Sequence, residues 1–323
     1  MSGGAVRVFA RAAGQNVLHP HSPAEHRITV LWWVMFAVAV VGFALVAYLL
    51  LLGWIRRNRA ALLFGGGERA ATALVIGLGI GMPIVLLSAL FIWSDIFVIR
   101  STAAPRPGST AMTVHVTGHQ WFWEIRYPGT RAITANELHI PTRTRVDVEG
   151  TTADVIHSLW VPELNRKIDL IPGRTNRVLL YADRAGTYEG ECAEFCGLQH
   201  AHMLLIVIAQ PRVEFDAWLR DNEAPGRVPI GVDAQRGEQV FLAQACASCH
   251  QIRGTTAQGR VGPDLTHVAT RTTLAAGGIP NDRPHLEAWV RDPQHDKPGN
   301  KMPEVRLSRS DLTALVAYLE DLK

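Results

Sequence analysis

Four cysteines are the residues with the clearest chemical potential in this chain of 323 residues. They form two close pairs, Cys192 with Cys196 and Cys246 with Cys249. In an exported protein, four cysteines at such spacings could simply form two disulfides. The residues around each pair decide between that interpretation and a role in holding cofactors.

The first pair lies in a segment that is rich in soft metal ligands. His200 and Met203 follow Cys196, so two thiols, an imidazole and a thioether fall close together in the sequence. Thiolate, thioether and imidazole ligands favour copper among the common metals. Two glycines in the segment argue against a long helix and predict a loop that enters a strand at Met203. In that strand His202 would point to the opposite face, so we exclude it as a ligand.

A further histidine, His157, lies upstream in a stretch whose composition favours a β-strand. A strand could bring this imidazole beside the loop that carries the cysteines. Two thiolates and two imidazoles could then hold two copper ions if the sulfurs bridge them. The alternative is a disulfide beside ordinary histidines. Three other histidines lack soft-ligand neighbours and are expected to be structural or exposed: His115, His119 and His139.

The second pair is followed directly by His250, which completes the C-x-x-C-H attachment signal of c-type haem. In such a site both thiols bind the haem covalently and the histidine is the proximal ligand. Met302, the last methionine of the chain, is the predicted second axial ligand, because a thioether raises the haem potential as an electron carrier needs. Without a haem, Cys246 and Cys249 would form a disulfide and the adjacent histidine would be coincidental. The alternative axial ligands are three histidines: His267, His285 and His295.

The elements around these residues predict two water-soluble domains. Residues 110–210 contain short β-branched stretches separated by glycine and proline, which favours an antiparallel sandwich or small barrel. Residues 211–230 are expected to form an end helix and a linker, and residues 231–323 a helical domain. The predicted strands are Met112–Val116, Arg145–Glu149, Asn176–Tyr181 and Met203–Ala209, and the predicted helices of the last domain include Gly237–Ala245 and Leu307–Leu322.

Two apolar stretches precede these domains. Ile28–Ile55 and Ala70–Ser94 carry no charged residue, and each is long enough to cross a bilayer as a helix. We therefore predict a transmembrane hairpin over residues 28–99, after an N-terminal tail of residues 1–27. A cleaved signal peptide with one anchor is the alternative, but the first stretch is too long for a signal-peptide core. Positive loops stay in the cytoplasm, so both termini should face outward. The arginines that connect the two stretches are Arg56, Arg57, Arg59 and Arg69.

Four runs of residues carry a resemblance to a known family: Gly118-His-Gln-Trp-Phe-Trp123, His157-Ser-Leu-Trp-Val-Pro162, Ile171-Pro-Gly-Arg174 and Cys192-Ala-Glu-Phe-Cys196. Together they resemble cytochrome c oxidase subunit II. The resemblance covers roughly residues 28–210, and the fused C-x-x-C-H domain makes the chain similar to subunit II of caa-type haem–copper oxidases. It implies a multidomain membrane protein with a two-helix transmembrane hairpin, an all-β cupredoxin-like domain and an all-α cytochrome c domain.

The resemblance implies a role for each residue of the copper segment. Cys192 and Cys196 would bridge the two copper ions of a binuclear centre. His157 and His200 would each bind one copper ion. Met203 would be a weak ligand of one copper ion, and a backbone carbonyl would complete the other.

Three further residues take expectations from the same resemblance. Glu194 would supply that backbone carbonyl, and its carboxylate would reach a magnesium ion at the interface with subunit I. Trp121 would lie on the route by which electrons enter, although a tryptophan of the core is the alternative. Family members often have a glutamate at the start of the second span. Here the expected position falls near Ile76, and the nearest acidic residue is Glu68, whose role stays open.

These expectations predict the subunit through which electrons enter a proton-translocating respiratory oxidase. A donor such as a cytochrome c or a quinol-oxidising complex would reduce the haem c. Electrons would pass to the copper pair and then to a haem in subunit I, where oxygen is reduced to water. Subunit III is a further expected partner. The chain would lie in the bacterial inner membrane, with both termini and the cofactor domains on the periplasmic side.

Several other functions fit parts of the sequence. The corresponding subunit of a copper-containing nitric oxide reductase and a free-standing membrane electron carrier are the main alternatives. A quinol oxidase subunit fits less well, because those relatives lack the copper ligands, and a copper-delivery protein would not need the haem motif. The net charge of +3 is too small to indicate nucleic-acid binding.

Overall fold

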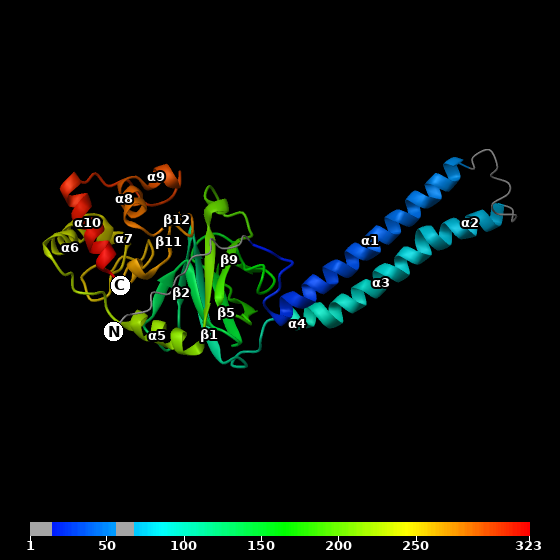
Figure 1. Cartoon of the computed structure of the whole chain (residues 1–323), viewed down its shortest axis with the longest axis horizontal. Helices are drawn as coiled ribbons and strands as arrows, with labels where there is room; N and C mark the ends of the chain where they lie inside the picture. Colours follow the sequence, from blue (N-terminus) through cyan, green and yellow to red (C-terminus); the bar gives the residue numbers. More distant parts are fainter. Residues whose placement is uncertain (1–14, 56–67) are drawn as a thin grey trace. The chain divides into compact units, whose positions relative to one another are not determined.

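The computed structural model describes residues 15–55 and 68–323, which form two compact units (Figure 1). One unit is a helical hairpin, Pro23–Ala103. The other contains Ala104–Lys323 together with the segment that ends at Ser22. Within this second unit we distinguish the β-domain, residues 112–223, from the C-terminal domain, residues 232–323.

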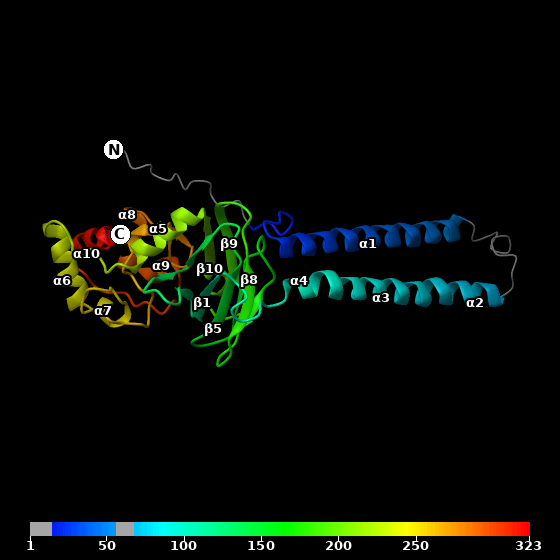
Figure 2. The ribbon, with the colours of Figure 1, turned by 90° about the horizontal axis from the view of Figure 1, so that it is seen from below.

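The hairpin consists of two long apolar helices that lie side by side (Figure 2). Helix α1 spans Pro23–Ile55, and a second continuous helical stretch spans Glu68–Thr102. Their mean hydropathies are 2.7 and 2.5 over windows with few charges, and both are long enough to cross a membrane. The second stretch comprises α2 (Glu68–Ile76), the π-helical turn η2 (Gly77–Gly81), α3 (Met82–Ser94), η3 (Asp95–Ile99) and α4 (Arg100–Thr102).

Pro83 is accommodated where the helical geometry changes. It lies in the first turn of α3, directly after η2. Because proline lacks an N–H, it is tolerated at the start of a helix, and a π-helical turn before it re-registers the backbone. Arg69 and Glu68 lie in the first turn of α2. The other predicted arginines of the connection, Arg56, Arg57 and Arg59, fall outside the described residues.

The β-domain is a sandwich of two five-stranded sheets. One sheet has the order β3-β2-β1-β5-β8 and the other β4-β10-β9-β6-β7. Most neighbouring strands are antiparallel, but β1 pairs with β5 and β4 with β10 in parallel. The strands are β1 (Met112–His119), β2 (Phe122–Arg126), β3 (Ile133–Ala135), β4 (Glu137–Pro141), β5 (Val146–Thr152), β6 (His157–Trp160), β7 (Ile168–Leu170), β8 (Asn176–Leu180), β9 (Gly186–Cys192) and β10 (Leu204–Gln210).

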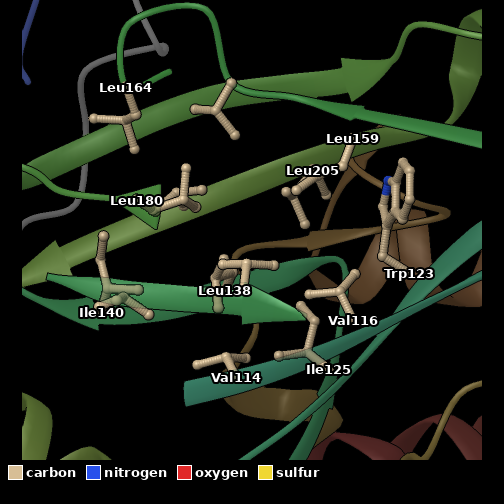
Figure 3. Close-up of a cluster of buried hydrophobic side chains, with 14 of the residues drawn as sticks. Val114, Val116, Trp123, Ile125, Leu138, Ile140, Leu159, Leu164, Leu180 and Leu205 are labelled. Carbon is tan, nitrogen blue, oxygen red and sulfur yellow. The ribbon is translucent and has the colours of Figure 1, made fainter. Parts of the chain in front are cut away.

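Alternating apolar residues fill the space between the two sheets (Figure 3). In β10, for example, every second residue is buried, as expected for a strand with one face on a core. Trp123 is the largest fully buried side chain. The helix α5 (Arg212–Glu223) follows β10 and packs Phe215 and Trp218 against the same core. The all-β prediction is therefore confirmed, and the expected end helix belongs to this domain.

The C-terminal domain is built mainly from helices. α6 (Val232–Ala243) crosses α10 (Arg309–Asp321) so closely at Gly237 that a Cβ there would lie 2.0 Å from the Ala314 carbonyl oxygen. The glycine is thus required by the crossing. The remaining elements are α7 (Cys246–Cys249), η5 (Val268–Thr270), β11 (Thr273–Leu274), β12 (Ile279–Pro280), α8 (Arg283–Arg291) and α9 (Pro293–Asp296).

Candidate copper and haem sites

The predicted copper ligands meet where two antiparallel strands of the second sheet adjoin a loop. β6 begins with His157, and its antiparallel neighbour β9 ends with Cys192. Residues 193–203, which we call the ligand loop, connect β9 to β10 and carry the remaining ligands. One ligand atom from each of His157, Cys192 and Cys196 lies within 4.8 Å of the other two, and all three side chains are buried.

All six predicted ligand groups lie in one continuous cluster. The two cysteine sulfurs are 3.7 Å apart. Each has a histidine Nδ1 beside it, from His157 at 3.8 Å and from His200 at 3.7 Å. The Met203 sulfur lies 3.9 Å from Cys196 Sγ, and the Glu194 carbonyl oxygen lies 3.2 Å from Cys192 Sγ. The structure therefore brings together the six ligand groups that the sequence predicts.

These separations fit ligands that share metal ions. Metal–sulfur bonds of roughly 2.3 Å with tetrahedral angles place two thiolates on one metal a little under 4 Å apart. A disulfide would instead need an S–S distance of about 2.05 Å. All four cysteines lie within the described residues and are free. The geometry thus favours a metal centre over the disulfide alternative.

The two thiols lie within hydrogen-bonding distance of each other. The hydrogen bond with Cys196, followed by that with His157, lowers the pKa of Cys192 despite burial. The hydrogen bond with Cys192 and burial raise the pKa of Cys196. The surroundings of Cys192 thus favour the thiolate, the form in which cysteine binds metals.

Asp154 fixes the orientation of the His157 ring and is a residue that the sequence analysis missed. Its Oδ1 lies 2.9 Å from His157 Nε2, and its Oδ2 accepts a hydrogen bond of 2.8 Å from the Gln120 backbone N–H. With Nε2 engaged as donor, Nδ1 is the free ligand atom on the side of Cys192. Gly118 leaves room for the ring, since a Cβ there would be 2.8 Å from His157 Cδ2. An aspartate three residues before a ligand histidine was the only available signal.

Trp121 connects the ligand loop to the C-terminal domain. Its Nε1 donates a hydrogen bond of 3.0 Å to the Cys196 carbonyl oxygen. Its ring lies over Gly197, whose φ is +115° and where a Cβ would lie 3.0 Å from Trp121 Cζ2. The indole packs partly against the β-domain core, but it also lines the cavity of the C-terminal domain. The residue is thus more than core filling.

The C-x-x-C-H motif forms a short helix and a turn beside that cavity. Cys246 and Cys249 are the ends of α7, and His250 follows in an extended conformation. The His250 Nδ1 lies 2.8 Å from the Pro263 carbonyl oxygen, so it donates there and leaves Nε2 as the ligand atom. The ring lies against Gly262, where a Cβ would be 2.5 Å from His250 Cε1.

Met302 faces the same cavity as the motif. The cavity is lined largely by apolar residues, together with Cys246, Cys249, His250 and Met302. Among the described residues that line it, none of the three alternative histidines occurs. His285 and His295 are exposed beside aspartates. His267 is buried, with its Nε2 3.0 Å from the Ala224 carbonyl oxygen. The geometry favours Met302 over them.

An arginine in the cavity wall indicates that an anionic group fits there. Arg271 lines the cavity, and its Nε is buried without a hydrogen-bond partner. Its Nη2 donates to the Asp264 carbonyl oxygen. Burial lowers the pKa of the guanidinium, an effect that a bound carboxylate would offset. A largely apolar cavity with a buried guanidinium Nε that has no partner suits haem, which has an apolar ring and two carboxylates.

His202 and Glu194 are both exposed residues of the ligand loop. The expected strand start at Met203 is wrong: β10 begins at Leu204, and His200–His202 form a 3-10 turn. His202 is exposed in this turn, with Nδ1 2.8 Å from Gln199 Oε1, so strand alternation is not the reason that it lies apart from the cluster. Glu194 is exposed, which leaves its carboxylate accessible.

Comparisons with known proteins match both domains. Residues 130–210 match the family "Cytochrome C oxidase subunit II, periplasmic domain", and residues 234–323 match "Cytochrome c". "Cytochrome c oxidase subunit 2" of Alkalihalophilus pseudofirmus is 37% identical over 299 residues, which cover 90% of this chain and 84% of the relative. The protein of that name from Bacillus subtilis is 32% identical over 259 residues, 75% of this chain and 72% of the relative. The solved periplasmic domain of subunit II of cytochrome oxidase of Bradyrhizobium japonicum is 30% identical, with 38% of this chain and 100% of that domain covered and a TM-score of 0.35.

Proposed function

The chain belongs to the cytochrome c oxidase subunit II family, and from that membership we propose that it carries electrons from a haem c in its C-terminal domain to a binuclear copper centre in its β-domain. Electrons enter the oxidase through this membrane-anchored subunit and pass on to subunit I. The chain is thus one component of an oxidoreductase complex. The bound haem and copper pair supply the one-electron chemistry.

The convergence of the six ligand groups is the observation that carries the proposal. Cys192 and Cys196 would bridge two copper ions, and His157 and His200 would each complete one of them. Met203 and the Glu194 carbonyl would be the weaker ligands at either end. Strands β6 and β9 hold two of these groups on a packed sandwich. Such a framework keeps the ligand geometry constant, which favours rapid electron transfer because little has to rearrange.

The cavity of the C-terminal domain would hold the haem. Cys246 and Cys249 would attach it covalently, and His250 and Met302 would be its axial ligands. Arg271 would pair with a haem carboxylate through its free Nε. Trp121 lines this cavity and donates a hydrogen bond to the Cys196 carbonyl oxygen, so it offers a route from the haem towards the copper ligands.

Further partners follow from the same proposal. The exposed Glu194 carboxylate would bind magnesium at the contact with subunit I, because hard oxygen ligands suit that ion. Subunit III and a cytochrome c or quinol-oxidising donor would complete the assembly. The two apolar helices would lie in the bacterial inner membrane, with both termini and both cofactor domains on the periplasmic side.

Metal and haem quantification on the full-length chain in detergent tests the proposal. We expect two copper ions and one covalent haem per chain, and an EPR spectrum in which one unpaired electron is shared between both coppers. Cys196→Ser should abolish that shared spectrum, since an alcohol is a poor bridging ligand for copper. The haem content should stay unchanged in this variant.

A chain that remains free of copper after reconstitution would overturn the copper assignment. Oxygen turnover by the purified complex, measured against nitric oxide turnover, tests the oxidase assignment separately.

Trp121→Phe tests the electron route. It removes the indole N–H but keeps an aromatic ring, so copper reduction from the haem should slow while both cofactors are retained.

A further inference from the structure

The segment that carries Met302 has little regular structure of its own. Residues 297–302, the Met302 loop, follow the four-residue helix α9. Side-chain hydrogen bonds fold it: Gln294 Nε2 donates to the Asn300 and Met302 carbonyl oxygens, at 3.0 and 2.9 Å, and Asn300 Oδ1 accepts from the Met302 backbone N–H at 2.7 Å. A loop held in this way depends on its neighbours for a fixed position.

The neighbour of the Met302 loop is the ligand loop of the β-domain. Gln199 Nε2 donates a hydrogen bond of 2.6 Å to the Pro298 carbonyl oxygen. Lys297 Nζ donates one of 2.8 Å to the His202 carbonyl oxygen and one of 3.0 Å to that of Ala275. Both side chains are buried, with exposed fractions of 4% for Gln199 and 5% for Lys297.

Burial of Lys297 marks this contact as more than incidental. Burial lowers the pKa of its ammonium group to about 8. A buried ammonium is costly unless its N–H groups have acceptors, and here carbonyl oxygens from both domains serve. Losing the contact with the ligand loop would leave this group poorly satisfied, so the two loops should stay together.

Close steric fit supports the hydrogen bonds. Gly299 has a φ of +80°, and a Cβ there would lie 2.6 Å from Leu198 Cδ1 of the ligand loop. On the other side of the Met302 loop, Lys301 Nζ lies 3.6 Å from Asp154 Oδ2. Asp154 is the residue that orients His157. The loop that carries the proposed haem ligand is thus fitted directly onto the residues that hold the proposed copper ligands.

We propose that Lys297 and Gln199 are positioning residues that fasten the Met302 loop to the ligand loop, so that methionine ligation of the haem depends on docking of the C-terminal domain against the copper site. This inference rests on the proposed function, because Met302 is a haem ligand only within it. The two centres are then coupled mechanically as well as by electron transfer. A change at Gln199 in the ligand loop should therefore weaken methionine ligation of the haem, although Gln199 is not among the residues that line the cavity.

Absorption spectroscopy and redox titration of the full-length, copper-loaded chain in detergent test the proposal. A far-red band of the ferric haem reports the methionine–iron bond. Lys297→Met keeps the side-chain volume but removes the buried hydrogen bonds, and hydrogen bonds from charged groups are the stronger ones. We expect methionine ligation to weaken about tenfold, and the haem potential to fall because a thioether ligand is what raises it.

Gln199→Leu is the second variant, because Gln199 lies in the β-domain, and it removes the hydrogen bond to the Pro298 carbonyl together with the contact of Gln199 Oε1 with His202 Nδ1. It should weaken the band and lower the potential in the same direction, with covalent haem and the copper EPR spectrum retained. Lys167→Met is the matched control, since this lysine is exposed in the β-domain and is not among the residues that line the cavity.

Each outcome has a separate meaning. A methionine band that is unchanged in both Lys297→Met and Gln199→Leu overturns the coupling. An equal loss in Lys167→Met overturns the assignment of the role to Lys297. If the unmodified chain shows no methionine band, the ligand assignment of the proposed function fails instead.

Discussion

The two cofactor sites of this chain are assembled in opposite ways. At the copper site the ligand atoms are already in contact, and the strands β6 and β9 hold two of them against a packed core. At the haem site His250 and Met302 lie on segments outside the main helices and face a cavity. The ligands of the first site lie on a packed framework, whereas those of the second line a cavity that the haem would fill.

This difference predicts how each cofactor contributes to the stability of its domain. The sandwich core holds the copper ligands in place, so the β-domain should stay folded when copper is absent. An apolar cavity cannot be stable when it is empty, because its walls lose packing contacts. Haem should therefore be part of the core of the C-terminal domain, and removing each cofactor separately can test the contrast.

The largest effect is expected from removing the haem attachment. Replacing Cys246 and Cys249 together by alanine should eliminate covalent haem and leave the C-terminal domain sensitive to proteolysis, because its central cavity is left unfilled. The β-domain should resist the protease and keep two copper ions. Haem staining, limited proteolysis and copper quantification on the same preparation measure the three quantities.

The reciprocal variant is the control for this comparison. Replacing Cys192 and Cys196 by alanine should remove copper, yet both domains should resist proteolysis and covalent haem should be retained. The contrast between the sites collapses if this variant unfolds the β-domain, or if loss of haem also removes the copper.

A smaller effect should follow from Asp154, which orients a copper ligand without binding copper. Asp154→Asn keeps the size of the side chain but replaces the acceptor for His157 Nε2 by an amide. Groups that orient metal ligands typically affect metal affinity by about 10- to 100-fold. We expect a loss of copper affinity in that range, measured by competition with a chelator of known affinity.

The matched control is Asp169→Asn, an exposed aspartate on β7 of the same sheet. It should leave copper affinity unchanged. If copper affinity did not respond to Asp154→Asn, the strands alone would determine the ring orientation of His157.

The contrast between the sites also explains how far the sequence could predict them. Local patterns reveal local features: the cysteine spacings, the adjacent His250 and the soft ligands His200 and Met203 were all predicted, and the hairpin, all-β and helical parts of the fold are confirmed. Asp154 was missed because an acidic residue near a strand carries no signal until its partner is known. The contacts of Lys297 and Gln199 join residues 95 or more positions apart. Only the packing of two domains brings such residues together, so no pattern in either segment could predict them.

A pH effect that lies away from both cofactors concerns the framework of the β-domain. His139 on β4 is buried, its ring stacks on Trp218 at a centroid distance of 3.8 Å, and its Nδ1 lies 2.9 Å from Gln210 Oε1. Burial lowers its pKa from 6.5 to about 4. Between these values the unfolded chain binds more protons than the folded chain, so stability rises with pH through this window and falls as pH decreases.

Acidification from pH 6.5 to pH 4 should therefore cost the β-domain up to about 3 kcal/mol through His139 alone. His139→Gln removes the titrating group, so its denaturation midpoint should change less than that of the unmodified chain over this range. His115→Gln, at an exposed position, should show the same change in midpoint as the unmodified chain. Unfolding in urea followed by intrinsic tryptophan fluorescence measures both, and comparing variants at each pH cancels the contribution of the other titrating groups. If the unmodified chain and His139→Gln lose stability equally, His139 does not carry the acid sensitivity of the β-domain.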